Sequence, residues 1–328
     1  MATLQFSVVI TCRNQRDQVS DAVNSALAQT FSSCEIIVVD DASNDGSETI
    51  LRSYGDKIRL IRMERHQGAP SARNAGAAVA RGKYLVYLDG DDALKSWALW
   101  IYDQIIQARN PVLLLASLTW FKGTLPESRD AEVPIAAEFV SYKNWIEKDR
   151  PFRSSASALV IERGAFEFIG GWSKEVWPFD DQYLAAELAY SGRTIQILEP
   201  ATVFYRQHST NTIDNIPLLI RGCYRFVAAW ESNKRFRGKG HNLARFALIG
   251  GPALWVVKKT MRAGKRLDAL RLLLSIWPRV VVAGVLRVRS LFLGQLPKEI
   301  FPLRIPLNTA GRDTLRVQAA GNSLELFH

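Results

Sequence analysis

The sequence predicts an α/β protein built around a mostly parallel sheet that is flanked by helices. Over the first 110 residues, short apolar runs typical of buried strands alternate with segments of helical periodicity. Such alternation produces βαβ units, in which ligands bind at the carboxyl ends of the strands. The chain has 328 residues, 48% of them hydrophobic, which is enough for about two domains and a sizeable core.

The elements of this first part follow in a regular order. Four β-rich runs are predicted as strands, at residues 6–10, 35–41, 57–63 and 83–89. Three helices are predicted between them, at residues 19–27, 47–54 and 71–82, because apolar or alanine-rich positions recur there at helical spacing. The sequence Asn44-Asp45-Gly46 predicts the turn before the second helix.

The pattern is weaker after residue 93. A helix over 94–108 and an apolar strand over 111–120 are predicted, followed by a polar loop over 122–137. A strand over 155–163 and a helix over 180–192 come next, and Gly192 ends that helix. We find no internal repeat in the sequence.

Charge divides the chain into an acidic front and a basic rear. Residues 1–220 hold 22 Lys and Arg against 27 Asp and Glu, a net charge of −5, whereas residues 221–328 hold 20 against 5, a net charge of +15. Such an asymmetry indicates an anionic partner for the rear, either a membrane surface or nucleic acid. No RNA- or DNA-binding motif is present, so we do not expect nucleic acid.

The rear contains two long apolar segments with basic residues. The first is a predicted amphipathic helix in which Lys258, Arg262 and Lys265 share one face and Leu254, Val257 and Met261 lie on another. The second, residues 271–294, carries four arginines and is expected to be interrupted by Pro278. Two interpretations stay open: the rear binds an anionic membrane, or it is a helical extension that packs onto the front and leaves a solvated basic face.

Membrane-spanning and secreted classes are not favoured. The longest uncharged apolar stretch near the carboxyl terminus covers residues 246–257, whereas a spanning helix needs about 20 residues. The amino terminus lacks the basic region of a secretory signal. Cys12, Cys34 and Cys223 are scattered and form no CxxC pair, so we expect a reducing, cytoplasmic compartment.

The sequence Leu-Asp-Gly-Asp-Asp at 88–92 is the strongest sign of chemistry. Asp89, Asp91 and Asp92 follow an apolar strand, and a bound cation would resolve the repulsion among their carboxylates. Mg²⁺ or Mn²⁺ takes oxygen ligands and bridges to phosphates, which makes a nucleotide diphosphate its natural companion. A solvated acidic turn is the alternative.

A second acidic strand end and a loop that begins a helix lie near it in the predicted sheet. Asp40 and Asp41 can accept hydrogen bonds from a base or from ribose hydroxyls. The loop over 65–76 begins a helix with Arg73 in its first turn, which suits a phosphate or a ribose edge. Arg73 can equally pair with one of the acidic strand ends.

Five separated segments, taken together, resemble the family 2 glycosyltransferases of the GT-A fold. They are FSVVITCRN, EIIVVDDASNDGS, GAPSARNAGAAVARGKYLVYLDGDD, FIGGW and WPFDDQYLAAELAYSG, and they cover residues 1–210 in the family's order. The resemblance implies an inverting transferase that uses a nucleotide-diphosphate sugar, with a UDP-sugar as the first choice, and Mn²⁺ or Mg²⁺.

The resemblance also assigns residues of the donor site. Asp41, with Asp40 beside it, matches the family's nucleoside-binding acid, and Arg73 matches the arginine of its ARN segment. Asp89 and Asp91 match its metal-binding DxD, with Gly90 between them at the donor. Thr11 is expected to contact the nucleotide, although Thr11-Cys12-Arg13-Asn14 departs from the family's PTYN in three of four residues. Asp92 is a further candidate for ribose or metal.

The acceptor side is assigned in the same way. The family's Glu-Asp at a helix start is Asp180-Asp181 here, and the second acid is the expected general base, while Asp180 is the alternative base or a helix cap. His208 matches the late Tyr-Arg-x-His segment and is expected to complete the metal site. Trp172 and Trp177 flank the expected acceptor loop and are candidates for stacking on a sugar or for core packing.

The leading hypothesis is therefore a transferase that moves a sugar to a glycan or lipid-linked acceptor in cell-surface polysaccharide or glycoconjugate synthesis. We expect a cytoplasmic protein at the periphery of the inner membrane face. The expected domains are a catalytic domain over 1–220, with a nucleotide-sugar half over 1–110 and an acceptor half over 111–220, a basic helical region over 221–300 and a tail over 301–328. A non-catalytic nucleotide-sugar-binding protein and a sugar nucleotidyltransferase are the alternatives.

Overall fold

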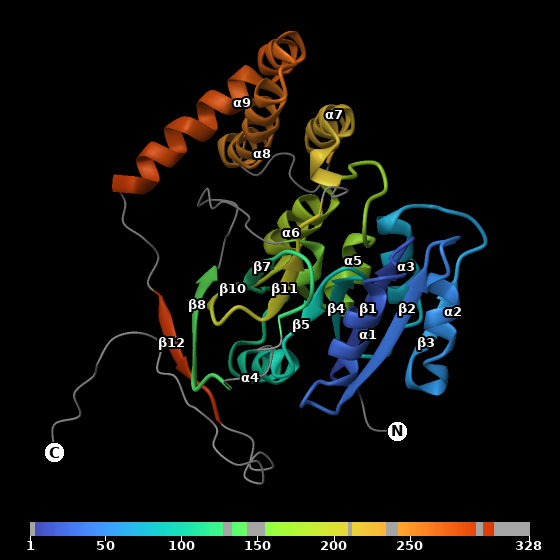
Figure 1. The fold of residues 1–328 in the computed structure, drawn as a ribbon. Helices are drawn as coiled ribbons and strands as arrows, with labels where there is room; N and C mark the ends of the chain where they lie inside the picture. Colours follow the sequence, from blue (N-terminus) through green and yellow to red (C-terminus); the bar gives the residue numbers. More distant parts are fainter. Residues whose placement is uncertain are drawn as a thin grey trace, which may run out of the picture.

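The computed structural model describes residues 4–126, 133–142, 155–208, 212–233, 242–292 and 298–304. Within these ranges nine strands form a central sheet in the order β12-β8-β10-β6-β9-β4-β1-β2-β3 (Figure 1). β8 and β9 run antiparallel to their neighbours, and the other seven strands share one direction. The strands are β1 Phe6–Cys12, β2 Cys34–Asp40, β3 Arg59–Arg62, β4 Tyr84–Asp89, β6 Leu113–Leu115, β8 Ala136–Tyr142, β9 Leu159–Glu162, β10 Thr194–Glu199 and β12 Glu299–Pro302.

Alternating strand residues build two separate apolar cores, one on each face of this sheet. On one face Val8, Ile10 and Val38 pack against α1 and α4, and on the other Val9 and Ile37 pack against α3, α5 and α6. The helices are α1 Val19–Leu27, α2 Ser47–Arg52, α3 Ala69–Ala78, α4 Ala98–Arg109, α5 Arg163–Ile169 and α6 Asp180–Ser191. Coverage of both faces confirms the predicted α/β class.

A small second sheet lies beside the first and has the order β5-β11-β7. Its strands are β5 Ala93–Leu94, β7 Leu118–Phe121 and β11 Val203–Arg206. The predicted strand over 111–120 is therefore two strands in two sheets, with a break at residues 116–117 between β6 and β7. β8 begins at the end of the predicted loop over 122–137; residues 127–132 of that loop lie outside the described ranges.

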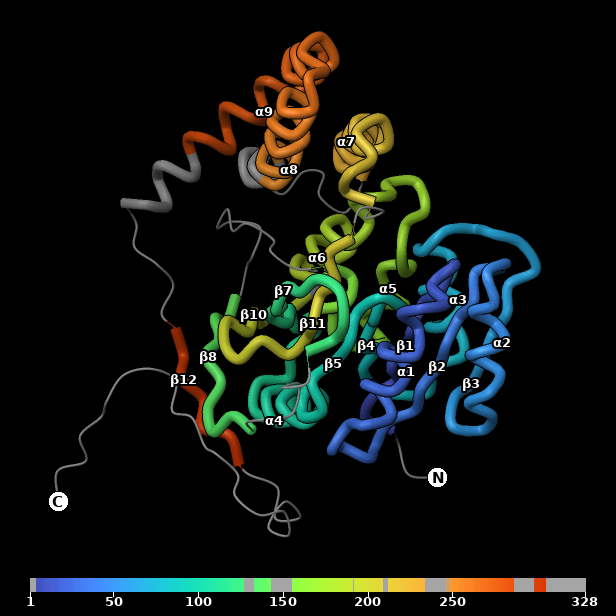
Figure 2. The backbone as a smooth tube through the Cα atoms, in the orientation of Figure 1, coloured from blue at the N-terminus to red at the C-terminus, as the bar shows by residue number. Residues whose placement is uncertain are grey.

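Three further helices follow the catalytic candidates: α7 Ile216–Ser232, α8 Asn242–Arg262 and α9 Arg266–Phe292. They lie at the top of the molecule in Figures 1 and 2, above α6. A shared apolar core joins them to α6 and β8, and in it the rings of Phe179 and Phe226 are 5.4 Å apart. None of the helices in the described ranges has the length and hydropathy that crossing a bilayer requires.

The structure corrects two expectations for this region. α8 ends at Arg262, and Gly264 has a φ of 78°, so Lys265 lies in the loop rather than on the same helical face as Lys258 and Arg262. α9 continues through Pro278, because Leu272 and Ile276 before it and Ala283 after it are buried and hold both halves of the helix. The cost of a proline inside a helix, about 3 kcal/mol, is offset by this burial.

Only part of the apolar face predicted for α8 is buried in the core. Val257 is 3% exposed and lies in the core, Leu254 is half-buried, and Met261 is 55% exposed. Lys258 and Arg262 face solvent, as both interpretations of the basic rear require. The expected domain boundary at 220–221 falls inside α7, and most of the expected tail, residues 305–328, lies outside the described ranges.

Candidate functional site

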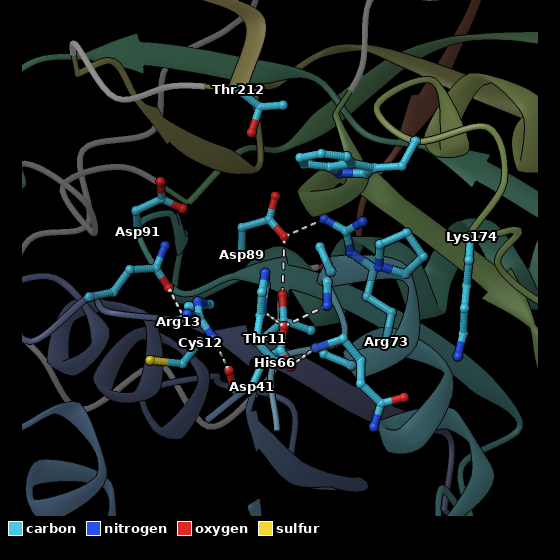
Figure 3. A pocket seen from close by; sticks show the side chains of 17 residues that line it. Thr11, Cys12, Arg13, Asp41, His66, Arg73, Asp89, Asp91, Lys174 and Thr212 are labelled. Carbon is cyan, nitrogen blue, oxygen red and sulfur yellow. Dashed lines mark hydrogen bonds and ion pairs between the residues drawn. The ribbon is translucent and has the colours of Figure 1, made fainter. Parts of the chain in front are cut away.

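A cavity of about 410 Å³ lies at the carboxyl ends of β1 and β4, a size typical of sites for small ligands. β1 pairs with β2 on one side and with β4 on the other, so the cavity lies where the strand order changes direction, the usual place for a ligand in such sheets. Its lining residues are Thr11, Cys12, Arg13, Gln15, Asp41, His66, Gln67, Gly68, Ala69, Pro70, Ala72, Arg73, Asp89, Asp91, Lys174, Trp177 and Thr212 (Figure 3).

Asp89 is the central acid of this cavity (Figure 3). Its Oδ1 accepts hydrogen bonds from Arg73 Nη2 at 2.6 Å and from Thr11 Oγ1 at 3.3 Å. The same guanidinium donates from Nη1 to Asp180 Oδ2 at 2.9 Å. Arg73 thus joins the acid at the end of β4 to the acid at the start of α6, residues that are 91 positions apart in the chain.

Arg73 is held rigidly. It is only 6% exposed, and its guanidinium carbon lies 4.6 Å from the centre of the Trp172 ring. Burial opposes its charge, but Asp89 and Asp180 outweigh this and raise its pKa, so it stays protonated. Trp172 is 2% exposed and also packs edge-on against Tyr87. Of the two roles expected for Trp172, sugar stacking and core packing, the structure supports core packing, because Trp172 has no free face and contacts Arg73.

Asp41 anchors the loop that precedes α3. Its carboxylate accepts hydrogen bonds from the backbone N–H groups of Gln67 and Gly68, each at 2.8 Å, and lies 2.7 Å from His66 Nδ1. Gly68 has a φ of 88°, which favours glycine at this turn. Three donors on one carboxylate leave room for one further donor, such as an N–H or O–H of a nucleoside.

Asp40 lies beneath the cavity rather than in it. It is fully buried, and its Oδ1 accepts a hydrogen bond from the backbone N–H of Ser43 at 3.0 Å. Its Oδ2 lies 3.7 Å from Arg62 Nε. Contrary to the expectation of ligand contact, Asp40 shapes the turn after β2, and of the two neighbouring acids only Asp41 reaches the cavity.

Asp91 and His208 form a pair beside Asp89. His208 Nε2 lies 2.7 Å from Asp91 Oδ2, and β11, which ends at Arg206, carries the histidine to this position. Burial, and then the charge of Asp89, raise the pKa of Asp91. Of the three residues singled out for metal binding, Asp89 and Asp91 therefore line the cavity, and His208 contacts Asp91 from outside the lining.

Asp92 has a structural role. It is 1% exposed and accepts hydrogen bonds from Ser157 Oγ and from the backbone N–H of Arg206. The Arg206 guanidinium in turn donates to the Asp91 carbonyl at 2.9 Å and to Asp21 at 2.6 Å. These bonds tie the acidic turn to β11 and fix the backbone of Asp91 relative to His208.

The residues at this end of the cavity fit a hard divalent cation. Carboxylate oxygens suit Mg²⁺ and Mn²⁺, and a cation would relieve the repulsion between Asp89 and Asp91. Over the described ranges, no group of three or more His, Cys, Asp or Glu side chains has an arrangement that could hold a metal. Asp91 and His208 supply two donors, so an ion bound there would need its remaining ligands from elsewhere, such as a diphosphate and water.

The acid pair at the start of α6 lies next to the cavity, behind Arg73. Asp180 is bound to Arg73, whereas Asp181 Oδ1 accepts a hydrogen bond from the backbone N–H of Gln182 at 2.7 Å. Burial raises the pKa of Asp180 to about 6, opposed by Arg73. Burial and repulsion from Asp180 raise the pKa of Asp181 to about 8. Neither acid lines the cavity itself, although Arg73, which does, contacts Asp180.

Gly90 is required by a close approach of two backbones. Its N–H donates to the Thr11 carbonyl at 2.8 Å, and an added Cβ would lie 2.9 Å from that oxygen and 2.5 Å from Gln15 Oε1. Gly90→Ala is expected to move Asp89 and Asp91 by several tenths of an ångström and to lower kcat/KM about 10- to 100-fold.

The melting temperature and the steady-state kinetics of Gly90→Ala test this expectation. Gly164→Ala is the matched control, because no atom lies within 4 Å of its added Cβ. Wild-type kinetics for Gly90→Ala would contradict a role for the spacing between β1 and the acidic turn.

Sequence reasoning missed several lining residues. His66 and Gln67 belong to the loop before α3, and their position depends on hydrogen bonds to Asp41, far away in the chain. Lys174 lies on the opposite side of Asp89 from Asp91 in Figure 3. Thr212 reaches the cavity because it precedes α7, a helix that the periodicity analysis did not identify.

Comparison with known proteins identifies the first part of the chain. Residues 7–117 match the profile of Glycosyl transferase family 2, which confirms the family resemblance for the three motif segments that lie in this range. The uncharacterized glycosyltransferase RP339 of Rickettsia prowazekii is 45% identical over 86 residues, 26% of this chain and 27% of RP339. The succinoglycan biosynthesis protein ExoO of Rhizobium meliloti is 39% identical over 88 residues, 26% of this chain and 25% of ExoO. The match thus spans about a quarter of these relatives' own length.

Solved structures share the fold over most of the chain. TarS 1–349 of S. aureus, in complex with UDP-GlcNAc, has a TM-score of 0.54 at 15% identity and covers 87% of this chain and 92% of its own. The mannosyltransferase PcManGT of Pyrobaculum calidifontis, in complex with GDP-Man and Mn²⁺, has a TM-score of 0.51 at 17% identity and covers 89% and 88%. This likeness confirms the GT-A fold.

Proposed function

We propose that this chain, whose residues 7–117 match the profile of Glycosyl transferase family 2, is an inverting, metal-dependent transferase. It moves a sugar from a nucleotide-diphosphate sugar to a glycan or lipid-linked acceptor. One observation carries the proposal: Arg73, Asp89 and Asp91 line one cavity, His208 contacts Asp91, and Arg73 links Asp89 directly to Asp180 of the acid pair Asp180-Asp181. A nucleotide-binding protein without turnover needs the first four residues but not the acid pair.

The donor is proposed to lie along the cavity from Asp41 to Asp91. Asp41 and the backbone of Thr11 bind the nucleoside. Asp89 binds the ribose, and Arg73 holds the Asp89 carboxylate in place. Asp91 and His208 hold Mn²⁺ or Mg²⁺, which when bound neutralises charge on the diphosphate leaving group. A UDP-sugar is our first choice of donor, and it is supported by the complex of the structurally similar TarS with UDP-GlcNAc.

Transfer needs a general base and an acceptor hydroxyl that faces the anomeric carbon on the side opposite the diphosphate. Asp181 takes the proton of the acceptor hydroxyl as that oxygen bonds to the anomeric carbon. The bond from that carbon to the diphosphate breaks on the opposite side, which inverts the configuration. Asp180 keeps Arg73 in position and, by its charge, makes Asp181 more basic. Trp177, which lines the cavity, is the remaining candidate for stacking on the acceptor.

The biological setting is proposed from the relatives and from the charge of the chain. ExoO is a succinoglycan biosynthesis protein, which favours a role in polysaccharide or glycoconjugate synthesis. The net charge of +15 over residues 221–328 favours a place at the inner face of the cell membrane. We propose that the catalytic unit ends before α7, at about residue 215, and that the basic helical unit follows it, because the expected boundary at 220–221 falls inside that helix.

The donor and the metal can be tested together by thermal denaturation. Purified protein is melted with UDP-, GDP- and dTDP-sugars, each with and without Mn²⁺. One class of donor is expected to stabilise the protein by roughly 2.7 kcal/mol at a hundredfold excess over Kd, and only when Mn²⁺ is present. Asp91→Asn is expected to lose the Mn²⁺-dependent part of that shift.

The control for this variant is Asp56→Asn, which changes an exposed acid of the same type. Retention of the full Mn²⁺-dependent shift in Asp91→Asn would contradict the proposed metal site. Donor binding without sugar transfer to any acceptor preparation, and without slow hydrolysis of the donor, would favour the non-catalytic alternative.

A further inference from the structure

α9 carries a row of exposed apolar side chains. Six residues on one side of this helix are between 51% and 71% exposed: Leu267, Leu270, Leu274, Trp277, Val281 and Val285. Their spacing of three, four, three, four and four positions places them on one face. The row spans about 27 Å of helix. Contiguous apolar surface of this extent marks an interaction site on a soluble protein.

The opposite side of α9 makes the contacts that pack this helix against the rest of the protein. The exposed row is therefore not needed for packing. Ala269, Leu272, Ile276 and Ala283 are buried in the core shared with α7 and α8. Gly250 of α8 allows the two helices to approach closely, because an added Cβ would lie 2.2 Å from the Arg279 carbonyl oxygen. Figure 1 shows α9 along the outer edge of the molecule, with α8 between it and α7.

Positive charge surrounds the beginning of the row. Lys258, Arg262, Lys265, Arg266 and Arg271 are all exposed, at the end of α8, in the connecting loop and at the start of α9. Residues 242–292 contain ten Lys and Arg and a single acid, Asp268. The apolar row and the cations together form one amphipathic surface, which we call the α9 surface.

We infer that the α9 surface docks the protein onto an anionic membrane, with α9 lying in the plane of the lipid headgroups. Leu274 and Trp277 enter the boundary of the acyl chains, and the lysines and arginines contact the anionic headgroups. Charge complementarity favours this partner over a second copy of the chain, because the cations beside the row meet anionic headgroups at a membrane, whereas the same surface of a second copy offers them a single acid, Asp268. Nucleic acid would leave the apolar row in water.

Docking at this surface bears on the site, and this step rests on the proposed function. α8 packs against α7, and Gly222 of α7 lies against the Trp177–Pro178 segment at the cavity wall, where an added Cβ would be 2.4 Å from Pro178 Cδ. Continuous packing therefore connects the docking helix to the wall of the cavity that Trp177 forms. A lipid-linked acceptor held in the same membrane would meet the site at that wall.

Sedimentation of the full chain with vesicles tests the inference. Vesicles of phosphatidylcholine alone are compared with vesicles that contain about one third phosphatidylglycerol, at low and at physiological salt. The wild type is expected to sediment with the anionic vesicles, and less at the higher salt. Leu274→Gln/Trp277→Gln is expected to weaken this binding about tenfold or more, because both apolar contacts are lost.

Two further variants make the result specific. Lys265→Glu/Arg266→Glu is expected to weaken binding to anionic vesicles by a similar factor while leaving the apolar row intact. Phe168→Gln/Ile300→Gln is the matched control, because these exposed apolar residues, 73% and 78% exposed, lie on α5 and β12. The control is expected to bind vesicles like the wild type.

Two results would overturn the inference. One is unchanged sedimentation of the Leu274→Gln/Trp277→Gln variant with anionic vesicles. The other is a dimer in sedimentation velocity without lipid that this variant abolishes, which would assign the row to a second copy. The donor-induced thermal shift, measured on every variant without vesicles, reports separately on the proposed function and is expected to match the wild type throughout.

Discussion

Asp181→Asn is expected to lower kcat by about 10²- to 10⁴-fold while leaving the donor-induced thermal shift unchanged. An amide keeps the shape of the carboxyl group but cannot take the acceptor's proton. We assign the base to Asp181 because Asp180 Oδ2 already accepts a hydrogen bond from Arg73 Nη1. Asp181 Oδ1 accepts one from the backbone N–H of Gln182. Steady-state kinetics with saturating donor, together with the melting temperature, measure the effect.

Asp180→Asn is the informative companion. It removes a charge from the Arg73 pair, so it is expected to reduce stability as well as kcat, and to lower the pKa of Asp181 by removing the charge that raises it. A loss of kcat in Asp180→Asn with wild-type kcat in Asp181→Asn would reverse the two assignments. A loss of donor binding in Asp181→Asn would place this acid at the donor instead.

The same assignment predicts the pH dependence. A general base acts only when it is deprotonated, and burial followed by repulsion from Asp180 raises the pKa of Asp181 to about 8. Activity is therefore expected to rise with pH through about 8 and to fall tenfold per pH unit well below it. A half-point near 4, the ordinary value for aspartate, would contradict a base whose pKa is raised by its surroundings.

The sequence was most informative where local pattern and fold agree. The helix over residues 19–27 and the strand ends at Asp40 and Asp89 lie where the periodicity predicts them, because βαβ units are built from near neighbours in the chain. Placing acids at strand ends was sufficient to find the cavity, since parallel strands bring their carboxyl ends to one edge.

What periodicity could not predict depends on distant partners. Asp40 and Asp41 are adjacent and chemically alike, yet only the loop at Gln67 and Gly68 decides which of them faces the cavity. Trp172 becomes a support because Arg73, 99 positions earlier in the chain, covers its face. The continuation of α9 through Pro278 likewise follows from its burial against α8, which no local rule contains.

Arg73→Met is expected to cost about 3–5 kcal/mol of unfolding free energy at pH 7.5, because it leaves Asp89 and Asp180 close together in a partly buried site without their shared cation. Arg73→Lys is expected to recover only part of this loss, since one ammonium cannot match the two separate contacts of the guanidinium. Urea denaturation of each variant measures the change.

The dependence of this deficit on pH separates lost charge from lost packing. Asp180 already has a pKa raised to about 6 by burial, with Arg73 opposing the rise, so removal of Arg73 raises it further. A carboxyl group whose folded pKa exceeds its unfolded value destabilises the protein increasingly as pH rises above the unfolded value. The deficit of Arg73→Met is therefore expected to shrink between pH 7.5 and pH 5.

Arg52→Met provides the comparison, because Arg52 pairs with Glu48 on the surface of α2, where their side chains are 65% and 24% exposed. Loss of such a pair is expected to cost less than about 1 kcal/mol. If Arg73→Met loses the same stability at both pH values, the loss comes from the missing contact with Trp172. If Arg73→Met is as stable as the wild type, Asp89 and Asp180 do not need Arg73. Only a pH-dependent deficit supports an arginine that holds the donor acid and the acceptor acid together by charge.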